Sequence, residues 1–504
     1  MKQKINLISP NLIVLRDDLF TTGVVYMPIG MAYLASSFRS NNFKPNVIDS
    51  FGESPNQINI YGKFISRGLL VEEVLNRIEV DSIVNFVYAP NLTCHGSTVE
   101  IIKAINSKFP NIPTVVFENT QAVTAYSLRH LSKEFFDIGA DYIITGEPEI
   151  SSISIIDNII NNKNISIEGV ISKVKNKGEE FTKAIKIPNL NQLHFPAWDL
   201  FPLKNYWSLG YAHGPLSTKK YLPILTSRGC PYPCKFCVVP ETNDRKWRAR
   251  DPKNVVDEME YFLNNFGVNE YHIEDLNPTI KDDRIQEICK IIIERNLDFI
   301  WKISAGTKVE SIRSEETVML MAKSGCKYVS ISPESGSTRI MKEIKKPFNY
   351  NHAINIISYF NKYNIYSQAC FVLGFPGETQ IDLYETKKMI KDLTKAGVDE
   401  VAQFIITPVP GSSIYEEIKG FEDYSELNFS PSWREDYKLL NKFRLSTYRI
   451  FLIWKFIYHP LKILKQPLNF LTRKFNTKME MVPFRALHLF LIIKGIIGSH
   501  AKKI

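Results

Sequence analysis

Three cysteines stand close together near the middle of the sequence. Cys230, Cys234 and Cys237 have the spacing C-x3-C-x2-C. Thiolates are the ligands that iron–sulfur clusters require, and this spacing lets one loop bring three sulfurs to one cubane. Three ligands leave one iron without a protein ligand. The pattern therefore predicts a [4Fe-4S] cluster that binds and activates a small molecule at its open iron.

The alternatives are a zinc loop that lacks its fourth ligand, or chance. Zinc sites usually combine two cysteine or cysteine–histidine pairs. The sequence has no second pair, because Cys289, Cys326 and Cys370 stand singly and are typical of core positions. We therefore expect an iron–sulfur cluster rather than zinc.

The cysteine loop follows the first strand of a repeated strand–helix pattern. Predicted strands recur about every 35 to 40 residues in this half of the chain, which is typical of βα units. They cover residues 222–226, 270–275, 299–305, 328–332, 367–373 and 400–406. Six units are too few for a closed eightfold barrel, so the pattern predicts a partial (βα)6 barrel with its chemistry at the carboxyl ends of the strands.

The segment RGCPYPCKFC, residues 228–237, resembles the signature loop of the radical S-adenosylmethionine (SAM) superfamily. The resemblance implies that Cys230, Cys234 and Cys237 hold the cluster and that its open iron chelates the amino and carboxylate groups of SAM. One electron would then cleave the sulfonium and give a 5'-deoxyadenosyl radical.

The same resemblance implies further cofactor-binding positions, one beside the third cysteine and the others at strand ends. These residues are Phe236, Glu274, Asp275, Lys308, Glu334 and Ser335. From the residues alone, a helix cap or a solvated loop is favoured over cofactor binding for Glu274 and Asp275. The stretches FVLGFPGET (371–379) and TPVPGSSIY (407–415) are similar to turns that follow the fifth and sixth strands in this superfamily.

The first 165 residues alternate short apolar strands with segments of helical spacing. The strands are predicted at 5–9, 45–49, 82–88, 114–118 and 142–145. Five such units predict an α/β domain of the flavodoxin-like Rossmann type, with any ligand at the carboxyl ends of the strands.

A domain of this type ahead of the barrel is the arrangement of the cobalamin-binding subfamily. The stretches 27–38, 144–149 (ITGEPE) and 195–203 are similar to that subfamily's pattern, which implies cobalamin as a further cofactor. No D-x-H-x-x-G motif exists, so a histidine ligand to cobalt is not supported. The loop 117–123 (FENTQAV) replaces a glycine-rich turn, and its bulk could intrude on a corrin. The alternative is a degenerate domain kept for architecture or substrate positioning.

The net charge of +9 is unevenly placed. Residues 431–504 carry 15 Lys and Arg against three acids, a local charge of +12, which leaves 9 − 12 = −3 for the rest. Trp, Phe and Ile accompany the basic residues, which favours helices at a membrane interface over nucleic-acid binding. A helical bundle packed beneath the barrel is the alternative, because 456–464 (FIYHPLKIL) resembles a helical region that follows the barrel in this subfamily.

Seven cysteines without a signal sequence predict a reducing compartment, hence the cytoplasm, with peripheral contact at the inner face of the membrane. No uncharged apolar run is long enough to predict a transmembrane helix. The predicted domains are a cobalamin-binding-like domain (1–165), a linker (166–205) whose stretch 193–202 crosses a surface, the barrel (206–420) and a basic, aromatic-rich helical region (421–504).

The predicted function is cobalamin-dependent methylation of an unactivated carbon. A radical cyclase, oxidase or rearrangement enzyme on the same scaffold is the close alternative, and a non-catalytic corrinoid or redox sensor is the second. Methylthiolation of tRNA is disfavoured, because Cys94 is the only cysteine of the first domain. The expected partners are a small-molecule substrate, which the tail suggests is lipid-like, and a reductant such as flavodoxin or ferredoxin.

Overall fold

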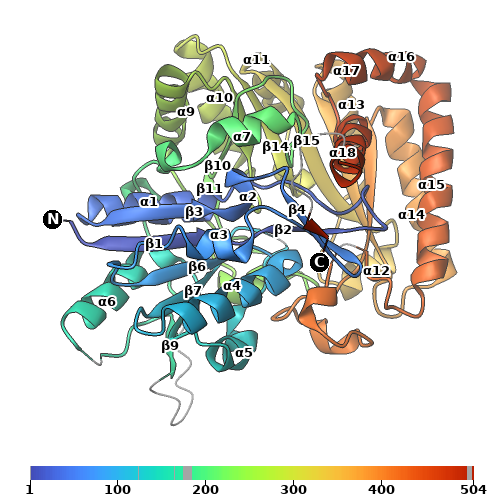
Figure 1. Cartoon of the computed structure of the whole chain (residues 1–504). Coiled ribbons are helices and arrows are strands. Elements are labelled where there is room, and N and C mark those ends of the chain that lie inside the picture. The colour runs from blue at the N-terminus through green and yellow to red at the C-terminus, as the bar shows by residue number, and fades with distance from the viewer. Residues whose placement is uncertain are drawn as a thin grey trace.

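Two six-stranded sheets form the framework of the chain (Figure 1). The computed structural model describes residues 2–122, 124–163, 165–173, 184–428, 430–495 and 502–503. The first sheet has the order β3 (Lys44–Asp49), β1 (Lys4–Ser9), β6 (Asn85–Ala89), β7 (Thr114–Glu118), β8 (Tyr142–Ile144) and β9 (Val170–Ser172). All neighbours are parallel except β8 and β9. This order confirms the predicted flavodoxin-like domain.

Helices cover both faces of this sheet because its central strands are apolar on both sides. Phe86 and Tyr88 of β6 belong to one hydrophobic cluster, and Val87 and Ala89 to another. The first cluster includes α1 (Ile29–Ser40) and α6 (Pro148–Ile160), and the second includes α3 (Val71–Leu75), α4 (His95–Lys108) and α5 (Ser132–Asp137). A three-layer sandwich results.

A small second sheet was not predicted from the sequence. It joins β2 (Leu12–Leu15), β5 (Phe64–Arg67) and β4 (Ile58–Tyr61) in antiparallel pairs, and β18 (Lys502–Lys503) adds to β4 in parallel. The short helix α2 (Ser50–Glu53) precedes β4.

The second large sheet is entirely parallel. Its order is β10 (Tyr221–Ile224), β13 (Glu270–Ile273), β14 (Ile300–Thr307), β15 (Cys326–Glu334), β16 (Tyr366–Leu373) and β17 (Glu400–Ile405). The helices between these strands are α9 (Pro252–Phe266), α10 (Asp282–Glu294), α11 (Glu315–Lys323), α12 (Thr338–Glu343), α13 (Tyr350–Lys362) and α14 (Gln380–Ala396). Because β10 and β17 both remain at the edges, the barrel is open, which confirms the partial (βα)6 architecture.

The segment predicted to cross a surface is instead partly core. Trp198 is only 1% exposed, and its neighbour Ala197 donates its backbone N–H to the carbonyl of Ala32 in α1. The following helix, α7 (Leu203–Leu209), buries Tyr206 in the same hydrophobic cluster. The aromatic residues of this segment therefore fill space between the two large sheets, which local composition alone did not reveal.

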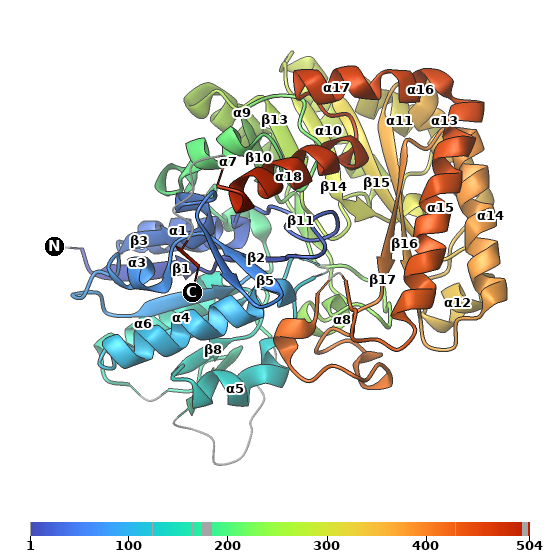
Figure 2. The same cartoon turned by 45° about the vertical axis from the view of Figure 1, so that its right-hand side comes forward.

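The C-terminal region is helical, as predicted. It forms α15 (Tyr437–Tyr458), α16 (Pro460–Leu464), α17 (Gln466–Thr472) and α18 (Lys478–Ile493), and α15 packs against α14 (Figure 2). Glu400, at the start of β17, accepts backbone hydrogen bonds from Lys478 and Met479 and so caps α18. Across the described ranges, none of the helices combines the length and the apolar character needed to span a membrane.

Candidate functional site

The cysteine loop leaves the second large sheet at its carboxyl edge. It runs from β11 (Ser227–Arg228) to α8 (Val239–Thr242), and Cys230, Cys234 and Cys237 are all free and partly accessible. Burial, and then the negative charges of the other two thiolates, raise the pKa of Cys237 to about 12. The three sulfurs are therefore close enough on one loop for their charges to interact.

No three Cys, His, Asp or Glu side chains of the described residues have the spacing of ligands to a single metal ion. A cubane needs a wider arrangement, because each thiolate binds a different iron atom. The donor set of the loop, three thiols and no carboxylate or imidazole, is the set that an iron–sulfur cluster takes. The residues present therefore fit the predicted cluster.

Of the predicted cofactor positions, Phe236 lies within this loop, and Glu334 and Lys308 lie beside it. Phe236 packs edge to face on Phe375, with 5.5 Å between ring centroids. Glu334 ends β15 with a left-handed backbone (φ 61°) and forms a buried ion pair with Lys346. A non-glycine residue in this conformation costs free energy and is held by its surroundings, a situation that clusters at functional sites.

Lys308 lies beside the same loop. Its ammonium is 2.9 Å from Glu310 and 5.2 Å from the ring centroid of Tyr232, which stands between the first two cysteines. Phe236, Lys308 and Glu334 are thus near the cysteines, and their contact with a cofactor stays a prediction.

The side chains of Asp275 and Ser335 already have hydrogen-bond partners within the protein. Asp275 is fully buried and accepts hydrogen bonds from the backbone of Thr226 (2.7 Å) and from the hydroxyls of Thr226 and Ser227. The Ser335 hydroxyl is 3.2 Å from that of Thr386. Asp275 therefore fixes the strand end that leads into the cysteine loop, and direct cofactor binding by either residue stays a prediction.

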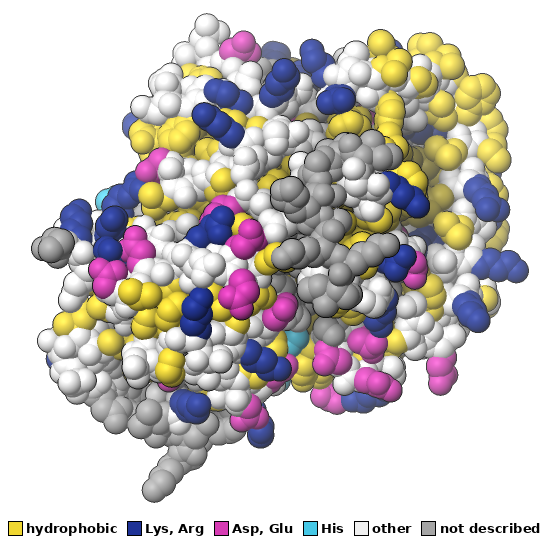
Figure 3. All heavy atoms as spheres, in the orientation of Figure 1, with side chains coloured by type: hydrophobic (Ala, Val, Ile, Leu, Met, Phe, Trp, Pro, Cys, Tyr) yellow, Lys and Arg dark blue, Asp and Glu magenta, His cyan; other side chains and the backbone are white. Residues whose placement is uncertain are grey.

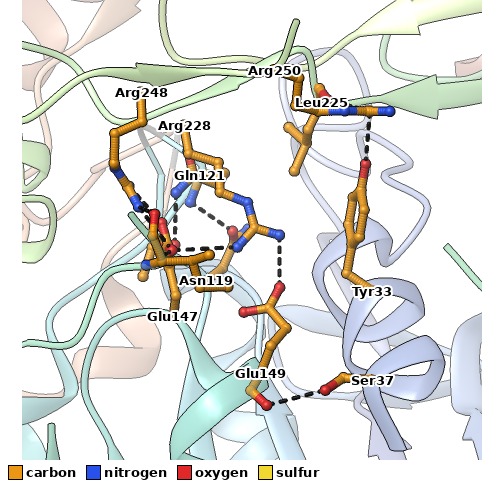
Figure 4. Close-up of polar contacts among 12 residues, drawn as sticks. Tyr33, Ser37, Asn119, Gln121, Glu147, Glu149, Leu225, Arg228, Arg248 and Arg250 are labelled. Atoms are coloured by element: carbon orange, nitrogen blue, oxygen red, sulfur yellow. Dashed lines mark hydrogen bonds and ion pairs between the residues drawn. The ribbon is translucent and has the colours of Figure 1, made fainter. Parts of the chain in front are cut away.

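Buried ion pairs join the first domain to the start of the cysteine loop (Figure 4). Arg228 lies 2.6 Å from Glu149 and 3.6 Å from Glu147, and Glu147 is also 2.6 Å from Arg248. Both glutamates belong to the ITGEPE turn, which was predicted only from resemblance. All four side chains except Arg248 are less than 5% exposed.

The loop FENTQAV supports the cysteine loop directly. The backbone N–H of Gly229, next to Cys230, donates to Gln121 Oε1 at 3.0 Å. Asn243, beyond α8, donates to the carbonyl of Thr120 at 2.8 Å. The bulk that replaces a glycine-rich turn is therefore used in part to hold the cysteine loop; residue 123 lies outside the described residues.

A cavity lies between the two large sheets and is lined by residues of both domains. The first domain lines it with Asn11, Asp49, Asn91, Asn119 and Gln121, which follow or end β1, β3, β6 and β7. The barrel contributes residues of β10, β13 and β14 and the segments beside them. Carboxyl ends of parallel strands thus face the cavity from both domains, as expected for a ligand site.

Three residues of this region were missed from the sequence. His213 Nδ1 is 2.7 Å from Glu274, and its Nε2 is 3.2 Å from the ammonium of Lys478 in α18. The ring of Tyr26 lies against that of His213, with 4.4 Å between the ring centroids and a tilt of 36°. The ammonium of Lys478 also donates to the carbonyl of Ser304 at 2.8 Å. No spacing links these residues in the sequence, so only the fold brings them together.

The contacts of His213 define where its proton sits. An ammonium has no lone pair, so Lys478 donates and His213 Nε2 accepts, which leaves the proton on Nδ1 facing Glu274. Burial lowers the pKa of His213 and that of Lys478. The predicted cofactor residue Glu274 is therefore held by a neutral imidazole at the wall of the cavity.

Comparison with known proteins identifies the class. Residues 224–390 match the family model described as the radical SAM superfamily, which confirms the predicted radical SAM domain over this third of the chain. Cytidylyl-2-hydroxyethylphosphonate methyltransferase from Streptomyces wedmorensis is 24% identical over 475 residues, which cover 86% of this chain and 85% of that protein. Anaerobic magnesium-protoporphyrin IX monomethyl ester cyclase from Cereibacter sphaeroides is 28% identical over 258 residues, which are 50% of this chain but only 40% of that protein.

Solved structures share the arrangement of both domains. TsrM from Kitasatospora setae, a radical SAM methyltransferase, superposes with a TM-score of 0.62 at 15% identity and covers 82% of this chain and 76% of its own. OxsB, a cobalamin-dependent SAM radical enzyme, gives 0.61 at 16% identity over 88% of this chain and 56% of its own. At these identities the likeness establishes the fold.

The buried ion pairs give a first prediction. Replacing Arg228 with Met leaves Glu149 buried without its cation, so the free energy of unfolding should fall by about 3–5 kcal/mol. Urea denaturation measures this fall. The matched control is Lys253→Met, which breaks the exposed Lys253–Asp257 pair of 2.7 Å and should cost less than about 1 kcal/mol. Equal losses in the two variants would contradict the structural role of Arg228.

Asp49 gives a second prediction, because burial raises the pKa of this cavity residue from 3.8 to about 6. The folded state binds this proton more tightly than the unfolded state, so stability is lost as pH rises from about 4 to about 6. The loss should reach about 3 kcal/mol. Asp49→Asn should abolish it while keeping an acceptor for the Tyr206 hydroxyl, which donates to Asp49 at 2.8 Å.

The measurement is urea unfolding of wild type and Asp49→Asn across this pH range. The advantage of the variant should grow with pH, whereas the exposed control Asp137→Asn should show no such growth. A constant difference between wild type and Asp49→Asn would refute the assignment.

Proposed function

We propose that the chain is a cobalamin-dependent radical SAM enzyme that methylates an unactivated carbon of a small molecule. The observation that carries the proposal is the cavity between the two domains, with the cysteine loop held beside it by Gln121. Names of similar proteins support it, because they include a methyltransferase of similar length and cobalamin-dependent SAM enzymes of the same fold.

The residues that would hold the cluster are Cys230, Cys234 and Cys237. When bound, the cluster and SAM supply a carbon-centred radical, and a corrinoid supplies a methyl group. The first domain lines the cavity with apolar side chains, amides, hydroxyls, the thiol of Cys94 and one carboxylate, and with none of its described histidines. A corrinoid placed there would have no histidine ligand from this domain, in agreement with the missing D-x-H-x-x-G motif.

The protein's own groups position the reactants and exclude water. Arg228 and Gln121 fix the start of the cysteine loop, and the Glu334–Lys346 pair stands next to its sulfurs. Tyr26, His213 and Glu274 line the cavity, and both carboxylate oxygens of Glu274 lie within 3.0 Å of His213 Nδ1. Such a preorganised, enclosed site keeps a radical away from solvent.

A radical cyclase on the same scaffold is the second candidate, and the relative from Cereibacter sphaeroides favours it over half of the chain. The two functions differ in the fate of the SAM methyl group. Transfer of an isotopically labelled methyl to product supports the methyltransferase, and product formation without that label supports the cyclase. A sensor would form no product.

We also propose the finer assignments of partner and location. A low-potential protein such as flavodoxin or ferredoxin reduces the cluster, because the reaction needs one electron. The chain works in the cytoplasm, with peripheral contact at the inner face of the membrane through its C-terminal helices.

A third prediction tests the proposal without a known substrate. Protein isolated anaerobically from cells supplied with cobalamin should carry one [4Fe-4S] cluster and about one corrinoid per chain. Reduced with dithionite, it should release 5'-deoxyadenosine from SAM. Cys237→Ser should lose iron and this activity, whereas the core control Cys289→Ala should keep both.

Two outcomes would contradict separate parts of the proposal. Full iron content in Cys237→Ser would reject the assigned ligands. A stoichiometric cluster without corrinoid would reject cobalamin and leave the radical chemistry standing.

A further inference from the structure

The outer surface of α15, α16 and α17 is apolar and uncovered. More than half of the large apolar side chains that are exposed in the described chain lie between residues 439 and 490. We call six of them, from α15, α16 and α17, the C-terminal apolar face: Leu452, Phe456, Leu461, Leu464, Leu468 and Leu471. In Figure 3 hydrophobic side chains gather at the upper right, over α15 to α17. Soluble proteins rarely leave such a patch without a partner.

This face is separate from the side of α15 that packs against the barrel. The opposite side of α15 does the packing, with Leu440, Thr447 and Phe451 buried at helical spacing. Leu452 and Phe456 belong to the other side of the same helix and point outward, and Leu471 of α17 is 78% exposed. The helix is therefore apolar on two sides, and only one side is used by the barrel.

The charged side chains of the segment that carries the face are all basic. No Asp or Glu occurs between Tyr437 and Met479. Six basic residues of this segment are exposed and have no carboxylate partner among the described residues. They are Lys438, Lys442, Arg449, Lys465, Arg473 and Lys474. By contrast, Lys455 and Lys462 turn inward, to the carbonyl and carboxylate of Asp399.

We propose that the C-terminal apolar face docks the enzyme on an anionic phospholipid bilayer. The inference names the lipid surface for the peripheral location proposed above and rests on that location, not on the radical chemistry. Apolar side chains would enter the interface while the surrounding lysines and arginines meet lipid phosphates. The helices would lie along the membrane rather than cross it.

Other occupants fit the face less well. In a symmetric dimer the same surface meets itself, so each basic rim would oppose an identical one. Nucleic acid would satisfy the charge but leave the leucines and Phe456 exposed. An anionic bilayer satisfies both the apolar centre and the basic rim.

The experiment is co-sedimentation of the full-length, cluster-loaded protein with vesicles. We expect binding to phosphatidylglycerol–phosphatidylethanolamine vesicles, and weaker, salt-insensitive binding to phosphatidylcholine vesicles. Leu461→Ser with Leu468→Ser should weaken binding to the anionic vesicles about tenfold or more, because two leucines no longer enter the interface. The matched control changes two exposed apolar residues of α14, Ile381→Ser with Tyr384→Ser, and should bind as wild type does.

A charge variant separates the two contributions. Arg449→Gln with Lys465→Gln should remove much of the preference for phosphatidylglycerol, whereas Lys103→Gln with Lys323→Gln, neutralisations elsewhere on the surface, should not. No binding to anionic vesicles, equal effects of variant and control, or a dimer that Leu461→Ser with Leu468→Ser dissociates would overturn the proposal. Formation of 5'-deoxyadenosine in every variant shows that a failure of docking is not a failure of the radical chemistry.

Discussion

A buried arginine connects the two halves of the molecule at the point where the chemistry is expected. Arg228 lies between the carboxylates of Glu147 and Glu149 and stands two residues before Cys230. Its guanidinium also lies 5.1 Å from the ring centroid of Tyr33 in α1. Because a charge removed from water must keep its partners, the cysteine loop can occupy only the position that the first domain allows.

A second network approaches the same strand end from the other side. Asp275 binds the backbone and hydroxyl of Thr226 and the hydroxyl of Ser227, while Arg284 donates to the carbonyl of Thr226 at 2.7 Å. With Gln121 on Gly229, consecutive residues ahead of the first cysteine are held through both backbone and side chains. The ligand loop itself is short and partly exposed, so its precision depends on this support rather than on its own packing.

The sequence predicted what is encoded locally. The strands of both large sheets except β9 were recognised because each is a short apolar run, and the cysteine loop because its ligands lie within eight residues of one another. β9 lies in the segment that was predicted to be a linker. The contacts of Gln121, His213 and Lys478 could not be predicted, because each joins segments that are distant in the chain and follows no spacing rule. The aromatic segment around Trp198 was misplaced for the same reason: its composition is equally suited to a surface strap and to an interface between domains.

The basic and apolar residues of the C-terminal helices face two environments, the barrel on one side and the exterior on the other. Their basic residues form two groups. Lys455, Lys462 and Lys478 point inward and contact carbonyls, a carboxylate or an imidazole of the barrel, so their charges interact within the protein. Only the outward residues remain to meet a partner. The two explanations for the basic tail, a bundle beneath the barrel and a membrane-facing helix, are therefore not exclusive, because each describes one side of the same helices. Since Lys478 reaches the wall of the cavity from this region, the segment that presents the apolar face also completes the surroundings of Glu274 and His213.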